Sequence, residues 1–211
     1  MTRIIFPPRP KGTIPPKDLN YYEKLGMWCV QPKYQGARCL IHITPEQEVN
    51  FYSRHGRPFL NYVPPKFLKS EILKLRGVEP GIEYWLDGEI LIKTTAQDTK
   101  NKIILFDILH YKRYLFLKPS QVERLKILYE ICGEPKELDP WRKMGYVVSE
   151  NILVAPVFYS NFAEHFNENN CDEVEGLVLR KKDSTIENYG EKEQDVNWLI
   201  RCRKPNKNCN F

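Results

Sequence analysis

The stretch Lys33-Tyr34-Gln35-Gly36-Ala37-Arg38 opens a region of short β-rich runs, and the interpretation of the whole chain starts from it. Lys33 follows Pro32 and precedes Gly36, where the backbone can turn tightly and approach a ligand closely because glycine has no side chain. A lysine before such a turn is usually an ordinary surface residue, so the stretch alone predicts little. Its meaning depends on the segments that follow.

Five later segments combine apolar runs with charged residues. They are Phe51-Tyr52-Ser53-Arg54, Leu86-Asp87-Gly88-Glu89-Ile90, Ile104-Leu105-Phe106-Asp107-Ile108-Leu109, Val174-Glu175-Gly176-Leu177-Val178-Leu179-Arg180-Lys181 and Asn197-Trp198-Leu199-Ile200-Arg201-Cys202-Arg203-Lys204. Glu89, Asp107 and Glu175 each end or interrupt an apolar run, where a carboxylate is costly unless it is paired or bound to a metal. Arg201 and Arg203 alternate with apolar residues, so both project from one face of a strand toward a single site.

The alternation of apolar and polar residues predicts an α+β fold with mostly antiparallel strands. Strands are expected over 38–43, 49–53, 84–92, 102–109, 151–156, 176–180 and 197–203. Helices are expected over 64–75, from Ser120 onward and between Asn161 and Asn169. The second helix has the clearest start, because Ser120 and Glu123 form a capping box. Residues 1–20, rich in proline and lysine, are expected to be an irregular N-terminal arm, and 21–211 a single domain.

The composition sets broad limits on function. The 211 residues suffice for one substantial domain, and the net charge of +5 suits a polyanionic partner without requiring one. No apolar run is long enough to cross a bilayer, and the N-terminus lacks the pattern of a signal peptide. The six cysteines form no CxxC pair, which predicts free thiols rather than a zinc site or a disulfide scaffold. We expect a monomer that acts in the cytoplasm, either of its own cell or of a host infected by a phage or virus, and has no membrane partner.

Taken together and in this order, the six segments resemble the motifs of covalent nucleotidyltransferases, namely ATP-dependent DNA ligases, RNA ligases and mRNA capping enzymes. The resemblance spans about residues 28–204. It implies the ligase adenylation fold, in which two mostly antiparallel sheets flanked by helices surround an ATP cleft. Phosphoryl transfer to a lysine requires a neutral amine, cations around the phosphates and carboxylates for a metal or a ribose.

The resemblance implies a role for each residue that matches a motif. Lys33 would be the catalytic nucleophile that forms lysyl-AMP. Gln31 would contact the adenine amino group, and Phe106 would stack on the adenine ring. Glu89 would bind the ribose hydroxyls or a metal, and Glu175 would lie beside Mg²⁺ or Mn²⁺.

The basic residues would contact phosphates. Arg38 and Arg54 match arginines that contact the nucleotide and the 5′-phosphate end. The remaining cations around the phosphates would be Arg180 or Lys181, together with Arg201 and Arg203. Taken singly, each of these residues has an ordinary structural interpretation: Phe106 suits a core, Glu89 a strand end, and the arginines of 197–204 a solvated face.

The sequence departs from the family in three respects. Gln35 stands where DNA ligases and capping enzymes usually carry aspartate, and so removes a negative charge beside the nucleophile. Arg201 and Arg203 stand where the last motif normally has two lysines, and arginine does not replace a compact ammonium at a tight site. Finally, we expect no C-terminal OB-fold within these residues. The alternatives are that the sequence is a piece of a longer protein, that the enzyme is a naturally minimal one, or that a partner protein supplies that surface.

The resulting hypothesis is an ATP-dependent, DNA ligase-like enzyme that seals 5′-phosphate/3′-hydroxyl nicks in a DNA or RNA duplex. The alternatives are an RNA ligase, a capping-type guanylyltransferase, and an inactive nucleotidyltransferase fold that binds nucleic acid.

Overall fold

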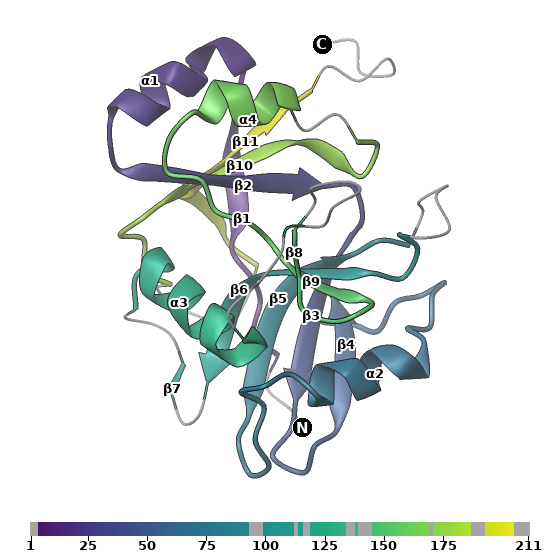
Figure 1. Ribbon diagram of the computed structural model, residues 1–211. Coiled ribbons are helices and arrows are strands. Elements are labelled where there is room, and N and C mark those ends of the chain that lie inside the picture. Colours follow the sequence, from purple (N-terminus) through teal and green to yellow (C-terminus); the bar gives the residue numbers. More distant parts are fainter. Residues whose placement is uncertain are drawn as a thin grey trace.

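Two β-sheets face each other, and helices cover their outer surfaces (Figure 1). The computed structural model describes residues 4–92, 99–111, 114–115, 119–133, 138, 145–168, 171–186 and 193–204. No helix in these ranges is long and apolar enough to span a membrane. The five cysteines within them are free thiols, as predicted.

The smaller sheet has four strands. In order across the sheet they are β1 (Arg9–Ile14), β11 (Asp195–Arg203), β10 (Val174–Lys181) and β2 (Trp28–Tyr34). The pairing of β1 with β11 is parallel and the other pairings are antiparallel. Its outer side carries a short 3₁₀ helix, Pro16–Asp18, and the helices α1 (Leu19–Lys24) and α4 (Phe162–Glu168). Leu19, Phe162, Leu177 and Leu179 are fully buried where these elements meet.

The larger sheet has seven strands. Its main path runs β4 (Val49–Ser53), β3 (Ala37–Ile43), β5 (Tyr84–Ile90), β6 (Ile103–Tyr111), β9 (Ile152–Val154) and β8 (Tyr146–Val147), and β7 (Tyr114–Leu115) pairs with β6. The helices α2 (Lys66–Leu73) and α3 (Gln121–Cys132) pack on its outer side over the largest core cluster. Alternate residues of its strands face this core and the smaller sheet, because successive side chains point to opposite faces.

The α+β class and the mostly antiparallel strands are confirmed. The predicted helices match α2, α3 and α4, and the capping box at Ser120 is present with both of its hydrogen bonds. The predicted strands match β3, β4, β5, β6, β9, β10 and β11 within a few residues at each end.

The expectation of an irregular arm over residues 1–20 is wrong in part, because residues 9–14 form β1, residues 16–18 form a 3₁₀ helix and α1 begins at Leu19. Proline lacks the N–H needed in a central strand, so Pro10 argued against a strand at this point. β1 is an edge strand paired on one side with β11, and an edge strand tolerates proline.

Candidate active site

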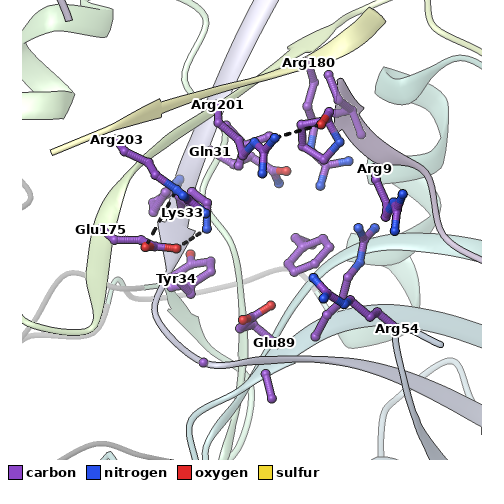
Figure 2. A pocket seen from close by; sticks show the side chains of 18 of the residues that line it. Arg9, Gln31, Lys33, Tyr34, Arg54, Glu89, Glu175, Arg180, Arg201 and Arg203 are labelled. Atoms are coloured by element: carbon purple, nitrogen blue, oxygen red, sulfur yellow. Dashed lines mark hydrogen bonds and ion pairs between the residues drawn. The ribbon is translucent and has the colours of Figure 1, made fainter. Parts of the chain in front are cut away.

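A pocket of about 750 Å³ opens between the facing surfaces of the two sheets. The smaller sheet contributes side chains from all four of its strands, and the larger sheet contributes residues from β3 to β6 (Figure 2). Ten of the eleven residues predicted for the site line this one pocket. They are Gln31, Lys33, Arg38, Arg54, Glu89, Phe106, Glu175, Arg180, Arg201 and Arg203.

Lys33 lies near the end of β2, just before the chain bends at Gln35 and Gly36. Its Nζ donates a hydrogen bond to Glu175, and Arg203 lies 4.0 Å from the other oxygen of the same carboxylate. In the sheet Lys33 pairs with Gly176, which pairs in turn with Arg203. A bulge between Val174 and Gly176 lets Glu175 reach the pocket from the same strand as Val178 and Arg180.

Gly176 is required at this bulge for two reasons. Its φ of +139° lies in a region that side chains rarely adopt, and an added Cβ would meet the carbonyl oxygen of Cys202 at 2.1 Å. Gly36 is required by close approach, because an added Cβ would lie 2.5 Å from the carbonyl oxygen of Ile90. The two glycines of the predicted motifs therefore bring backbone segments together around Lys33 and Glu175.

Gln31 is the least satisfied polar group in the pocket. Its side chain is 1% exposed, and neither atom of its amide has a hydrogen-bond partner within the described part of the chain. It pairs across the sheet with Val178, which pairs with Arg201, so Gln31 and Arg201 face the same cavity (Figure 2). Leaving an amide buried without a partner costs about 1–3 kcal/mol. The amide is therefore available to a ligand that offers both a donor and an acceptor.

Glu89 faces the cavity from β5, across from Gln31 (Figure 2). Burial raises the pKa of its carboxyl to about 7, although Lys33 and Arg38 oppose the rise and Gly36 donates a backbone hydrogen bond. Both of those cations have carboxylate partners of their own, Glu175 and Asp87. Glu89 is therefore a carboxylate whose negative charge is only partly compensated.

Arg38 and Phe106 form the wall beside Glu89. The Arg38 Nε donates to the fully buried Asp87 at 2.9 Å, and its Nη1 donates to the carbonyl of Pro8 at 2.8 Å. Burial raises the pKa of Asp87, and the Arg38 guanidinium opposes that rise. The guanidinium carbons of Arg38 and Arg180 lie 5.6 and 5.2 Å from the centre of the Phe106 ring. Phe106 therefore presents a partly exposed aromatic surface between two cations.

Arg180 is held more firmly than the sequence suggested. It is 4% exposed, and its Nη1 lies 3.2 Å from the fully buried Asp107. Asp107 also binds Arg124 of α3 at 2.9 Å, so one carboxylate joins two buried arginines. Burial lowers the pKa of Arg180, and Asp107 opposes that change. Lys181 follows on the opposite face of β10, with Leu177 and Leu179, and does not line the pocket.

Arg54, Arg201 and Arg203 also line the pocket. Arg54 is exposed at the rim of the pocket, directly after β4. Arg201 and Arg203 both point into the pocket from one face of β11, as the alternation of residues predicted. Burial lowers the pKa of Arg201, and its Nη2 donates to the carbonyl of Pro10 at 3.1 Å.

Sequence reasoning missed four lining residues that carry charge or can carry it: Arg9, Lys11, His55 and Asp195. Arg9 and Lys11 are two apart on β1, so the period of two was present in the sequence. The proline between them concealed it.

The pocket residues could hold a divalent metal only together with oxygens from a bound ligand. Among the described residues, no group of three or more His, Cys, Asp or Glu side chains could hold a metal ion. Mg²⁺ is usually held by one or two carboxylates together with substrate phosphates and water. Glu89 and Glu175 both line the pocket, and the raised pKa of Glu89 reflects a carboxylate that a cation would stabilise.

No protein-family model and no curated protein matches the chain in a sequence comparison.

Structure comparison finds ligase domains. The ligase domain from M. tuberculosis LigD superimposes with a TM-score of 0.64 at 16% identity, over 94% of this chain and 59% of that domain. Mycobacterial DNA ligase D complexed with ATP and MES gives 0.63 at 17% identity, over 96% and 61%. Chlorella virus DNA ligase-adenylate gives 0.56 at 18% identity, over 94% and 67%. The chain thus has the nucleotidyltransferase fold of ATP-dependent DNA ligases and spans about three fifths of the first two structures. The predicted fold is confirmed.

Proposed function

We propose that this chain is the adenylation domain of an ATP-dependent polynucleotide ligase, with Lys33 as the residue that carries AMP. One observation supports the proposal above all. Residues predicted from six separate segments line a single pocket in a fold shared with DNA ligases, one of which is described as complexed with ATP.

The first reaction joins Lys33 to AMP. The Nζ ammonium loses its proton to water, and the resulting amine attacks the α-phosphorus of ATP. A nitrogen–phosphorus bond forms, the bond to the bridging oxygen breaks, and pyrophosphate leaves. Glu175 fixes the position of Nζ through its hydrogen bond. When bound, Mg²⁺ or Mn²⁺ held by Glu89 and Glu175 would neutralise phosphate charge.

The nucleotide would be recognised by three groups. The unpartnered amide of Gln31 can accept from the adenine amino group and donate to the neighbouring ring nitrogen. Phe106 offers an aromatic surface on which a base can stack. Arg201 and Arg203 supply positive charge to the phosphates from the same strand.

Sealing would follow in two steps. AMP passes from Lys33 to the 5′-phosphate at a nick, and the neighbouring 3′-hydroxyl then displaces AMP to close the strand. DNA is the expected duplex and RNA the alternative. We expect sealing, more than adenylation, to depend on protein surface beyond these residues, because the structurally similar ligase domains are longer.

The test is incubation with α-labelled ATP and Mg²⁺, followed by a denaturing gel and mass measurement. We expect label on the wild type and none on Lys33→Ala, with Lys181→Ala as a matched control that keeps its label. If the protein shows neither label nor a pre-existing AMP adduct, the ligase proposal is wrong and the alternative is an inactive fold that binds nucleic acid. The ion pair of Arg180 with Asp107 would agree with that alternative, because it holds Arg180 away from a phosphate. Label from GTP alone would indicate a capping-type enzyme.

A further inference from the structure

A chain of hydrogen bonds crosses the rim of the pocket and joins the two sheets. Arg54 Nε donates to His55 Nε2 at 3.0 Å, and His55 Nδ1 binds Glu193. The second oxygen of Glu193 accepts from Arg9 Nη1, and Arg9 Nε donates to Asp195 at 3.0 Å. Arg54 and His55 follow β4 of the larger sheet, whereas Arg9 and Asp195 belong to β1 and β11 of the smaller one.

His55 lies between Arg54 and Glu193. A guanidinium can only donate, so in this arrangement Nε2 of His55 accepts from Arg54 and Nδ1 is directed at Glu193. Glu193 therefore receives one donor on each carboxylate oxygen. The hydrogen bond from His55, and after it the charge of Arg9, holds the pKa of Glu193 below its usual range. Donors from two sheets thus converge on one anionic group.

The carboxylate of Glu193 is held in a position from which it can be displaced. The side chains of Arg9, His55 and Glu193 are 36%, 50% and 25% exposed, respectively. Ion pairs at that exposure are weak, because water and salt screen them. A phosphate offers more charge and three oxygens to the same donors, and arginine binds it with two parallel hydrogen bonds.

We propose that Arg9 and His55 join Arg54, whose phosphate contact the resemblance already implies, in a phosphate subsite at the rim of the pocket, and that Glu193 occupies this subsite until a ligand phosphate displaces it. The identity of the ligand rests on the proposed function. The phosphate is either the terminal part of ATP or the 5′-phosphate at a nick. β1 supports the subsite rigidly, because Arg201 donates to the carbonyl of Pro10, next to Arg9.

The test measures equilibrium binding to the full chain without Mg²⁺, in EDTA, so that no reaction is required. One arm compares ATP with AMP by calorimetry. The other compares a fluorescent nicked duplex carrying a 5′-phosphate with the same duplex carrying a 5′-hydroxyl, by anisotropy. A preference for ATP assigns the subsite to the terminal phosphates, and a preference for the phosphorylated nick assigns it to the nucleic acid.

Two variants have opposite expected effects. Arg9→Gln should reduce the preference of the wild type, whether for ATP over AMP or for the 5′-phosphate nick over the 5′-hydroxyl nick, about tenfold, since it removes a charged hydrogen bond. Glu193→Gln should increase the same preference up to about fivefold, since it weakens the competing anion. Lys17→Gln and Glu164→Gln are the controls, because both residues are exposed and lie outside the pocket. Misfolding cannot explain a gain of binding in Glu193→Gln.

The proposal is overturned if the wild type shows neither preference, if each variant matches its control, or if both variants change binding in the same direction. Its failure is distinct from failure of the proposed function. A protein that forms lysyl-AMP without either preference loses the subsite only. A protein with the preference but no lysyl-AMP keeps the subsite and loses the ligase assignment.

Discussion

The carboxyl of Glu89 should make the free energy of unfolding depend on pH, and the substitution Glu89→Gln should remove this dependence. Burial raises the pKa of this carboxyl from 4.5 to about 7, so the folded state binds the proton more tightly than the unfolded chain does. The stabilising effect of that proton is complete below pH 4.5 and is lost as pH rises to about 7. At 1.36 kcal/mol per pH unit, the loss is at most about 3 kcal/mol, and contact with pocket water reduces it.

The measurement is urea unfolding, followed by tryptophan fluorescence, of the wild type and Glu89→Gln at several pH values between 4.5 and 8. The stability of the wild type relative to Glu89→Gln should fall steadily across this range, because glutamine does not titrate. Glu46→Gln, which removes an exposed carboxylate, serves as the control. A stability difference that stays constant with pH would refute the argument. Added Mg²⁺ should weaken the dependence, since a cation at Glu89 favours the ionised form.

Three other substitutions test the pocket and its supports. Gln31→Met should raise stability by about 1–3 kcal/mol, because it removes a buried amide without partners, yet weaken ATP binding at least about tenfold; thermal unfolding and calorimetry check the two effects. Asp107→Asn should destabilise by about 3–5 kcal/mol, because it leaves two buried arginines without their carboxylate, whereas the exposed Asp183→Asn should change urea unfolding little. Gly176→Ala should destabilise by more than about 2 kcal/mol and abolish lysyl-AMP formation, since the bulge that presents the neighbouring glutamate cannot form; a normally folded and active variant would contradict this.

The strands of the pocket could be predicted because their patterns are local. In 197–204, charged and apolar residues alternate, and this alone indicated that Arg201 and Arg203 share a face. The same reasoning failed for β1. Its alternation is interrupted by Pro10, and only the pairing with β11 at the sheet edge shows why the proline is tolerated.

Pairings between distant residues could not be predicted, because they depend on the register of both sheets. Arg180 matches a phosphate-binding motif, yet its partner Asp107 lies 73 positions away and holds it in the interior. His55 and Glu193 are 138 positions apart and meet only when the two sheets face each other. A motif thus predicted which residues reach the pocket, but not which of them are already engaged there.

The polar side chains on the inner strands differ in how completely they are paired. Asp87 and Asp107 are fully buried carboxylates on the inner strands, and each is matched by at least one arginine. Gln31 and Glu89 lie on the same inner surfaces, but within the described residues the Gln31 amide has no hydrogen-bond partner, and Glu89 accepts a backbone hydrogen bond from Gly36 without forming an ion pair. An incompletely paired polar group inside a protein costs free energy, and a ligand that completes the pairing would remove that cost. Under the proposed function, the Gln31 amide would face the base and the Glu89 carboxylate would face a ribose or a metal, in the same pocket as Lys33.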